Sequence, residues 1–219
     1  MTEPQLYKLN SSHAEKIIYI NTKSFEKDPY VNYMYYEITN EAEKLQFNRY
    51  LQGAFVNQTI DYDSSYSLGE DIQTMALLLP PHKPWPEDRW EEFTKHQEKE
   101  LLSRGLTTTF ERFVQLEEFL SEKFCQFNAI EGYYLLILST DHRFQGKGLG
   151  SKMLNQLFKI FDAEQKSCYL ECTSLYMVPF YQKHGFKILG QDMLPKVGDI
   201  PDDKLVKITF LRRDPEPLQ

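Results

Sequence analysis

The chain has 219 residues and a mass of 26.0 kDa, and 41% of its residues are hydrophobic and 26% are charged. This composition is typical of a globular protein with a sizeable core, and it excludes collagen-like, low-complexity and mostly disordered classes. The formal net charge is −7 and no long basic run is present. Binding to nucleic acid, which requires clustered Lys and Arg to neutralise phosphates, is therefore not expected.

The cysteine content and the apolar pattern indicate the cell interior. Cys125, Cys168 and Cys172 are too few and odd in number for a disulfide framework. Residues 1–16 contain no basic segment followed by an apolar run, so we expect no signal peptide. The sequence also lacks an apolar stretch of about 18 residues, the length that a transmembrane helix needs. We therefore expect a cytoplasmic protein, with the nucleus also open, and no membrane partner.

The N-terminal half is predicted to mix strands and helices. Weak alternation predicts a strand over 6–10, and a capping signal at Ser11 and Ser12, with Glu15 following, begins a helix that ends near Phe25. Further along the chain, the same signals predict a helix over 41–58, a hairpin of strands 64–69 and 72–79, and two charged helices over 87–104 and 107–127, joined at Gly105.

From Glu131 onward the pattern becomes one dense unit of alternating strands and helices. No internal repeat or linker interrupts the chain, so we expect one mixed domain. The predicted elements are a strand over 132–139, a glycine-rich turn over 140–150, an amphipathic helix over 151–165, a strand over 166–173, a short helix over 174–184, and strands over 185–194 and 203–213.

The glycine-rich turn at 145–150 lies between an apolar strand and a helix. Glycines at this place let backbone N–H groups converge on an anion at the helix N-terminus, so a phosphate-containing ligand is indicated. The alternative is a turn that binds nothing. A Walker loop is excluded because Gly148 follows Lys147, and a dinucleotide fingerprint requires glycine where Ser151 stands. Too few residues follow Glu171 for the further βα repeats of a dinucleotide-binding fold.

The turn sequence Q-G-K-G-L-G fits the pattern [QR]-x-x-G-x-[GA] and resembles motif A of the GNAT acyltransferase superfamily. The segment YLECTSLYMVPFYQKHGFKILG is similar to the second half of the GNAT pattern, in which a strand is followed by F-Y-x-x-x-G-F. Within the superfamily, the resemblance is strongest to the branch that contains puromycin N-acetyltransferase, and it covers residues 131–190. The chain departs from that branch at Thr140, Asp141 and His142, where V-x-P is usual.

The resemblance implies an α/β fold with a mixed sheet, in which the helices at 87–127 form an insertion before the central strand. Residues 1–219 would form a single domain, with an acceptor-side half over 1–130 and an acetyl-CoA-binding half over 131–212. The implied co-substrate is acetyl-CoA, and no metal is implied. The residues implied to hold it are Leu138, Ser139 and Thr140 along pantetheine, and Gln145, Gly146, Lys147, Gly148, Leu149, Gly150 and Ser151 around the pyrophosphate.

Two side chains are candidates for the chemistry of acyl transfer. Tyr181 occupies the tyrosine of F-Y-x-x-x-G-F and is the candidate general acid for the departing thiolate; the alternative is a core tyrosine. Glu171 is the candidate for orienting the amine or acting as base; the alternative is a structural hydrogen bond. The Leu138 N–H is the candidate oxyanion donor. Asp141 and His142 are weaker alternatives. We expect Cys168 and Cys172 to be small apolar residues of the core and not zinc ligands.

The acceptor is expected to bind in the N-terminal half. The loop at Asp28 and Pro29 corresponds to the segment that covers the acceptor in the superfamily, and we expect Tyr30, Tyr33 and Met34 to line the site. Clustered tyrosines suit an aromatic or amphipathic amine, although plain helix packing is an alternative. The expected function is acetyl-CoA-dependent N-acetylation of a small-molecule amine by a monomer or homodimer. A protein or peptide acetyltransferase and an inactive acyl-CoA sensor are the alternatives.

Overall fold

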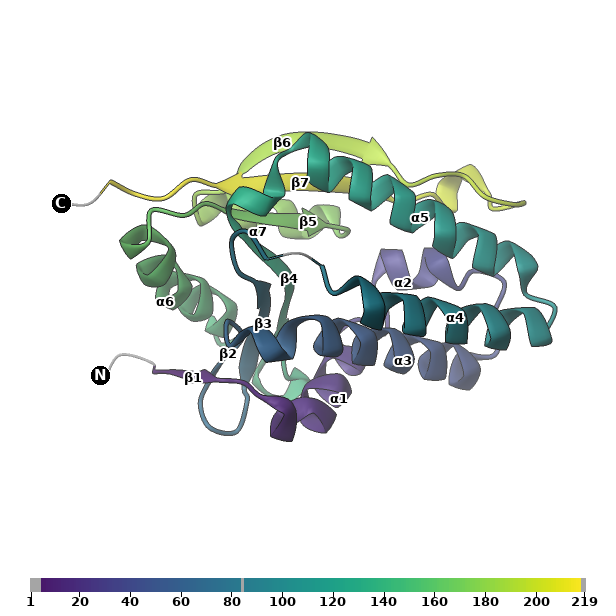
Figure 1. The fold of residues 1–219 in the computed structure, drawn as a ribbon, viewed down its shortest axis with the longest axis horizontal. Coiled ribbons are helices and arrows are strands. Elements are labelled where there is room, and N and C mark those ends of the chain that lie inside the picture. Colours follow the sequence, from purple (N-terminus) through teal and green to yellow (C-terminus); the bar gives the residue numbers. More distant parts are fainter. Residues whose placement is uncertain (1–4, 84, 218–219) are drawn as a thin grey trace.

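The computed structural model describes residues 5–83 and 85–217, and its centre is one seven-stranded sheet (Figure 1). The strand order is β1-β2-β3-β4-β5-β7-β6, and every neighbouring pair is antiparallel except β4 and β5. The strands are β1 (Leu6–Lys8), β2 (Tyr66–Leu68), β3 (Thr74–Leu79), β4 (Tyr133–Thr140), β5 (Cys168–Cys172), β6 (Lys187–Met193) and β7 (Lys207–Arg213).

The helices begin where short polar side chains can accept hydrogen bonds from free N–H groups. Asp28 accepts from the N–H of Tyr30 at 2.8 Å at the start of α2, and Asn40 accepts from the N–H of Ala42 at 3.0 Å at the start of α3. The helices are α1 (Ala14–Ser24), α2 (Pro29–Met34), α3 (Glu41–Thr59), α4 (Glu87–Ser103), α5 (Thr107–Gln126), α6 (Leu149–Ala163) and α7 (Val178–Lys183).

The start of the chain differs in detail from its prediction. The side chain of Asn10, one residue before the predicted signal, accepts from the N–H of Ser12 at 3.0 Å and caps a 3-10 turn at Ser11–His13 ahead of α1. Pro29 follows the Asp28 cap as the first residue of α2, a position where proline has no hydrogen bond to lose. Asp28-Pro29 therefore starts a helix that sequence reasoning did not predict.

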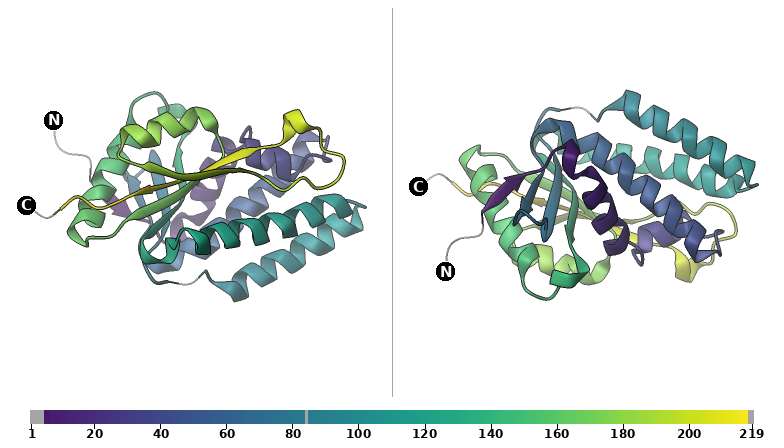
Figure 2. Two further views of the ribbon diagram at one scale, coloured as in Figure 1. Left: turned by 90° about the horizontal axis from the view of Figure 1, so that it is seen from above. Right: turned by 90° about the horizontal axis from the view of Figure 1, so that it is seen from below.

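One face of the sheet is covered by α6 and α7 (Figure 2). The amphipathic α6 buries Leu154, Leu157 and Phe161 against the strands, where they join Leu135 of β4 and Leu170 of β5 in one core cluster. This packing fixes the N-terminus of α6 at the end of β4, directly after the glycine turn.

The opposite face is covered by two groups of helices. Near β3 and β4, Ile17 of α1 and Val56 of α3 share a cluster with Met75 and Ile137. Over β5 and β7 lies α5, and it brings aromatic rings onto the strands. The ring pairs are Phe119 with Phe210 at 6.3 Å between centroids, Phe124 with Tyr134 at 5.3 Å and Phe124 with Tyr169 at 5.9 Å.

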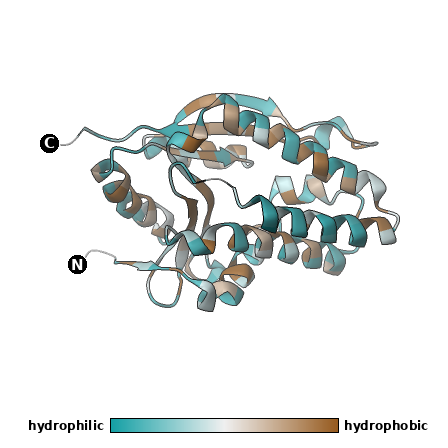
Figure 3. Cartoon of the chain, in the orientation of Figure 1, coloured by the Kyte–Doolittle hydropathy of each residue, from teal (hydrophilic) through white to brown (hydrophobic). Residues whose placement is uncertain are grey.

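A buried arginine fixes α5 against α2. Arg112 has no exposed surface and forms a bidentate ion pair with Glu37, with distances of 2.7 and 2.5 Å. Its guanidinium also donates to the carbonyl of Val197 at 2.9 Å and lies 5.3 Å from the centroid of the Tyr33 ring. The neighbouring α4 forms the outer layer, and its visible face is largely hydrophilic (Figure 3).

The expected mixed α/β sheet is confirmed, and so are the predicted hairpin, helix pair and C-terminal unit, within a few residues at their ends. That α4 and α5 are an insertion relative to other members of the fold, and that 1–219 is one functional domain, stay predictions. Among the described residues, no helix is both long and apolar enough to cross a bilayer.

Candidate active site

The two parallel strands at the centre of the sheet separate. Strand β4 pairs with β5 only where Tyr133 and Tyr134 face Cys168 and Tyr169, although β4 continues to Thr140. The register between β4 and β3 also shifts by one residue inside β4, because Leu77 pairs with Ile137 and Leu78 with Leu135, which leaves Leu136 as a bulge. Strands β4 and β5 therefore diverge beyond Tyr134 and Tyr169.

We call the opening between β4 and β5 beyond these paired residues the gap. The bulge determines which backbone groups of β4 face it. Before it, the N–H of Tyr133 donates to Ser167 beside β5 at 2.8 Å; after it, the N–H of Asp141 donates to Gln73 beside β3 at 3.0 Å. Because N–H groups alternate between the two edges of a strand, those of Leu138 and Thr140 face away from β3 and toward the gap. The structure thus places two backbone donors where an extended ligand can lie against β4.

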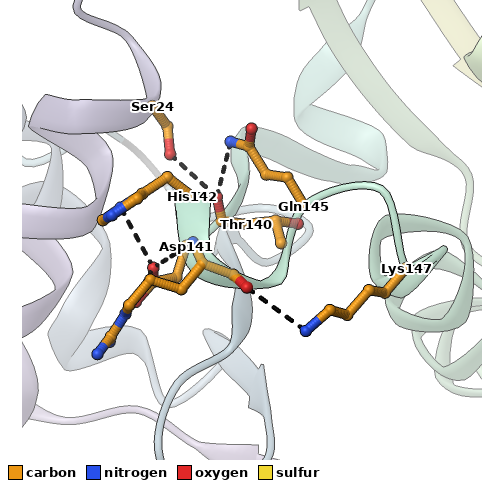
Figure 4. Close-up of polar contacts among 7 residues, drawn as sticks. Ser24, Thr140, Asp141, His142, Gln145 and Lys147 are labelled. Carbon is orange, nitrogen blue, oxygen red and sulfur yellow. Dashed lines mark hydrogen bonds and ion pairs between the residues drawn. The ribbon is translucent and has the colours of Figure 1, made fainter.

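The end of β4 is tied to the glycine turn (Figure 4). The carbonyl of Thr140 accepts from the side chains of Gln145 at 3.1 Å and Ser24 at 3.3 Å, and Lys147 donates to the carbonyl of Arg143 at 3.4 Å. Ser139, also on β4, is buried and donates to the side chain of Asn21 at 2.6 Å. These contacts shape the turn before any ligand is bound.

The turn itself has the backbone conformation of an anion site. Gly146 and Gly148 have φ values of 75° and 71°, and an added Cβ at either one would meet nothing within 4 Å. The glycines are therefore needed for their left-handed backbone and not for space. Helix α6 begins at Leu149, and among the described residues no side chain caps its N-terminus. The first N–H groups of α6, at Leu149, Gly150 and Ser151, are free to bind phosphate oxygens.

The acidic residue next to the turn is neutralised. Asp141 is buried, and its carboxyl accepts from the Arg143 guanidinium at 2.6 Å. This ion pair holds the pKa of Asp141 below its usual range, and exposed His142 lies 3.4 Å away. Asp141 therefore adds no unbalanced negative charge that would repel a phosphate, and its low pKa makes it a poor base.

Glu171 lies in β5 at the edge of the gap, held by two phenols. The hydroxyls of Tyr134 and Tyr169 each donate to its carboxyl at 3.0 Å. Burial raises the pKa of Glu171 to about 7, although the two hydrogen bonds work in the opposite direction. A carboxyl with this pKa exchanges protons near neutral pH, which is the property that a general base requires.

The opposite face of β5 carries the two cysteines. Cys168 and Cys172 are buried in the cluster beneath α6, and burial raises the pKa of Cys172 to about 11. Both thiols therefore stay protonated and unreactive at neutral pH. Across the described part of the chain, no group of three or more His, Cys, Asp or Glu is arranged to hold a metal ion.

Tyr181 of α7 packs against the core cluster that contains Cys168 and Cys172 of β5. Its ring packs edge-on against Phe180 and Phe186, with centroids 5.2 and 5.6 Å away, and its hydroxyl has no hydrogen-bond partner in the part of the chain that the structure describes. Burial, followed by the neighbouring Cys172, Cys168 and Asp28, raises the pKa of Tyr181. The phenol is therefore a protonated, uncommitted donor near β5, on the face opposite Glu171.

The acceptor side of the gap is formed by α2 and the chain after β5. Asp28, which sequence reasoning noted only as part of a loop, also accepts from the Thr173 hydroxyl at 2.9 Å, and this bond joins α2 to the end of β5. Burial raises the pKa of Asp28. A cleft of about 440 Å³ opens beside this bond, lined by Pro29, Asn32, Tyr33, Tyr36, Thr173, Ser174, Leu175, Tyr176, Asp203, Lys204, Leu205, Val206 and Lys207.

The three predicted acceptor residues occupy different places. Tyr33 lines the cleft, and its hydroxyl donates to the carbonyl of Pro195. Tyr30 is half-buried and does not line the cleft, and its pKa is raised by burial, then by Tyr35, and then by the carboxyls of Glu171, Glu117 and Asp28. Met34 has no exposed surface and packs in the core. An acceptor contact for Met34 stays a prediction that its full burial does not favour.

Sequence reasoning did not identify three features of the acceptor side. Tyr36 and Tyr176 line the cleft, and the Glu117 carboxyl of α5 contributes to the raised pKa of Tyr30. Tyr36 belongs to the tyrosine-rich stretch that the sequence does display. Glu117 carries no local signal, because it is one of many acidic residues on a charged helix pair.

Comparison with known proteins identifies the fold. The model of the GNAT acetyltransferase domain matches residues 113–188. A polyamine N-acetyltransferase of Drosophila melanogaster that forms N-acetylagmatine has a TM-score of 0.59 at 11% identity, with 96% of this chain and 99% of that chain covered. Arylalkylamine N-acetyltransferase 2 of Aedes aegypti has a TM-score of 0.57 at 14% identity, with 98% and 100% covered.

A third structure belongs to an acetyltransferase of Corynebacterium glutamicum, described as a histone acetyltransferase and related acetyltransferase. It has a TM-score of 0.59 at 14% identity and covers 100% of this chain and 99% of that chain. No curated protein matches the chain in sequence. The chain therefore has the fold of the GNAT acetyltransferases, and its residues 113–188 match the acetyltransferase domain of that family.

Proposed function

We propose that this protein is an acetyl-CoA-dependent N-acetyltransferase that acts directly on a primary amine of a small molecule. The observation that carries the proposal is the opening between β4 and β5, which has a glycine turn and an uncapped helix at one end and Glu171 at its edge. The left-handed Gly146 and Gly148 and the free donors of β4 fit a diphosphate followed by an extended amide chain. The similar structures of a polyamine N-acetyltransferase from Drosophila melanogaster and an arylalkylamine N-acetyltransferase from Aedes aegypti support an amine acceptor.

Each step of the transfer has a candidate residue in this chain. Acetyl-CoA, when bound, supplies the acetyl group as an activated thioester. Glu171 accepts a proton from the amine, directly or through water, so that nitrogen can attack. The Leu138 N–H donates to the carbonyl oxygen as negative charge develops on it. Tyr181 donates its proton to the departing sulfur. Because the acid and the base lie on opposite faces of β5, they serve opposite sides of the reacting carbon.

A small acceptor fits the cleft better than a peptide does. Its volume of about 440 Å³ is that of a small-molecule site, and Tyr33, Tyr36 and Tyr176 contribute aromatic rings to its wall. Tyr33 is anchored by its bond to the carbonyl of Pro195, so its ring forms a fixed part of the wall. A peptide acceptor and an inactive acyl-CoA sensor are the weaker candidates. Within the superfamily, the Q-G-K-G-L-G and P-F-Y-x-x-x-G-F motifs favour the puromycin N-acetyltransferase branch.

The direct test is release of free thiol from acetyl-CoA, measured across a panel of small amines and peptides. Turnover with one class of small amine is expected. Turnover with peptides alone would replace the small-molecule proposal by the peptide one. Binding of acetyl-CoA without any turnover would favour the sensor, and the absence of binding, measured by calorimetry, would reject the cofactor assignment altogether.

Replacing Gly148 by Ala is expected to weaken acetyl-CoA binding about 5- to 30-fold. At a φ of 71°, alanine is strained by about 1–2 kcal/mol, and the turn relaxes away from the conformation that aims its N–H groups at phosphate. Calorimetric titration measures the change. The control is Gly53→Ala in α3, where a Cβ would meet Ile18 at an ordinary 3.6 Å. Equal affinity in the Gly148 variant and wild type would show that the turn does not form the site.

A further inference from the structure

Asn21 of α1 is a buried polar residue at a position that the helix otherwise uses for apolar packing. Ile17, Ile20 and Asn21 lie on one face of α1, at the three- and four-residue spacing of a helix, and all three are buried. The two isoleucines pack with Ile137 of β4 in one core cluster. Asn21 has no exposed surface, and its Nδ2 has no hydrogen-bond partner among the described residues. A buried amide with an unpaired donor costs stability that a leucine would not, so its presence needs an explanation.

The oxygen of this amide is bound to β4. The hydroxyl of Ser139, which is also buried, donates to Asn21 Oδ1 at 2.6 Å, a short distance for such a bond. Because side chains alternate along a strand, Ser139 shares with Ile137 the face that α1 covers. The side chain of Leu138 packs on the opposite face, against the cluster beneath α6. The bond therefore joins α1 to the residue directly after Leu138, whose N–H is the candidate oxyanion donor.

The last two carbonyls of β4 are held by side chains as well. The Ser139 carbonyl accepts from the hydroxyl of Thr74 on β3 at 2.7 Å. The Thr140 carbonyl accepts from Ser24 of α1 at 3.3 Å and from Gln145 of the glycine turn at 3.1 Å (Figure 4). Side chains of three different elements therefore converge on the end of β4.

These bonds act on a part of β4 that the sheet supports on one edge only. Beyond the bulge, β4 still pairs with β3, whereas its pairing with β5 ends at Tyr134. The N–H of Leu138 faces the gap, and in the described part of the chain no strand pairs with it there to fix its direction. Apolar contacts are not directional, but a buried hydrogen bond favours one arrangement of the groups that it joins. The bond between Asn21 and Ser139 thus supplies from the face of the sheet a constraint that is missing at its edge.

We propose that Asn21 is a positioning residue for acyl transfer: its bond with Ser139 holds the end of β4 so that the Leu138 N–H points at the thioester carbonyl of acetyl-CoA. The inference rests on the proposed function and adds to it a residue that does not touch the reacting atoms. An oxyanion donor is effective when its direction is set before the reaction, and a displacement of about 1 Å can cost about 100-fold in rate. This role explains why α1 carries an amide where a leucine would pack more favourably.

The first test separates positioning from stability. Ser139→Ala leaves the whole Asn21 amide unpaired, so we expect a lower melting temperature and a kcat lower by about 10- to 100-fold. Asn21→Leu is expected to lower kcat by a similar factor. The double variant Asn21→Leu/Ser139→Ala replaces both partners by apolar groups, and we expect it to recover the melting temperature but not kcat. The matched control is Asn48→Leu in α3, which loses a buried bond to the Thr22 carbonyl of α1, 3.1 Å long in wild type, and is expected to keep wild-type kcat.

The second test measures the direction of the Leu138 N–H without turnover. S-ethyl-CoA carries a CH₂ group in place of the thioester carbonyl, so it offers no oxygen to this donor. In calorimetric titrations, wild type is expected to bind acetyl-CoA about 3- to 10-fold more tightly than S-ethyl-CoA, as one hydrogen bond predicts. In the double variant this ratio is expected to fall to about one while the affinity for S-ethyl-CoA is unchanged. Asn48→Leu is expected to keep the wild-type ratio.

Two results would overturn the proposal: recovery of wild-type kcat in the double variant, or a preference for acetyl-CoA that the double variant retains. If wild type turns over no amine but binds acetyl-CoA, the proposed function fails and the ratio of affinities still decides the role of Asn21. Loss of the preference in the double variant would then support positioning of the N–H. Equal affinity of wild type for the two ligands, or no binding of either, would reject it.

Discussion

Replacing Tyr181 by Phe is expected to lower kcat by about 100-fold or more, because a general acid contributes about 10²- to 10⁴-fold to proton transfer. The change removes one oxygen and leaves the ring packed between Phe180 and Phe186. No hydrogen bond of the described residues is lost, so stability is expected to be nearly unchanged. Steady-state kinetics at saturating acetyl-CoA, together with the affinity for acetyl-CoA, separates this effect from weaker binding.

The matched control is Tyr50→Phe, which removes the hydroxyl of an exposed tyrosine of α3 whose ring packs against Phe93 of α4. Wild-type kcat is expected for this variant. A second test replaces acetyl-CoA by an acetyl thioester whose leaving thiol has a low pKa. Such a thiolate departs without a proton, so Tyr181→Phe is expected to lose little kcat with this donor. Wild-type kcat in Tyr181→Phe would assign the phenol to core packing.

The part of the site that the sequence predicted well is local in the chain. Residues 145–150 combine a strand end, left-handed glycines and a helix start, and each of these features follows from neighbouring residues. The same is true of the alternation in β5, which puts Glu171 on one face and the two cysteines on the other. A pattern of this kind is complete within a few turns of chain and needs no tertiary information.

The acceptor side could not be predicted in the same way, because distant segments build it. Asp28 and Thr173 are 145 residues apart, and the bond between them has no sequence signal. Met34 was expected to line the acceptor site but is fully buried. The sequence of a short helix does not show which of its residues face the core. Glu117 differs from Glu118 only in burial, which is set by the packing of α5 on β5 and β7.

The opposite environments of Tyr181 and Glu171 explain why one strand can serve both ends of the reaction. Burial raises the pKa of both groups, but the consequences differ. The phenol, which ordinarily ionises near pH 10, becomes firmly protonated and is kept ready as a donor. The pKa of the Glu171 carboxyl rises to about 7, so this group can accept a proton near neutral pH. A similar degree of burial thus produces an acid on one face of β5 and a base on the other.

Replacing Glu171 by Gln is expected to lower kcat/KM about 100-fold above pH 8 and much less at pH 6, because wild type loses its base as pH falls below about 7. The measurement is a profile of kcat/KM from pH 5.5 to 9. Wild type is expected to decline below an inflection near 7, and the variant is expected to lack that inflection. The profile of Glu117→Gln, whose carboxyl also has a pKa of about 7, must retain the inflection if it belongs to Glu171.

The pH dependence of stability is expected to be opposite to that of activity: as pH rises, kcat/KM of wild type increases and its free energy of unfolding decreases. The folded pKa of Glu171 lies above its ordinary 4.5, so its stabilising contribution is complete only at low pH and is lost as pH rises toward 7. The rise from 4.5 to about 7 corresponds to about 3 kcal/mol. Glu171→Gln is therefore expected to unfold at a higher temperature than wild type at pH 8, and at a similar temperature at pH 4.

The control is Glu164→Gln. Glu164 also accepts a hydrogen bond from a tyrosine, Tyr133 at 2.7 Å, but its side chain is exposed. A variant that is less stable than wild type at pH 8, with equal loss of activity at every pH, would show that Glu171 only supports the strand.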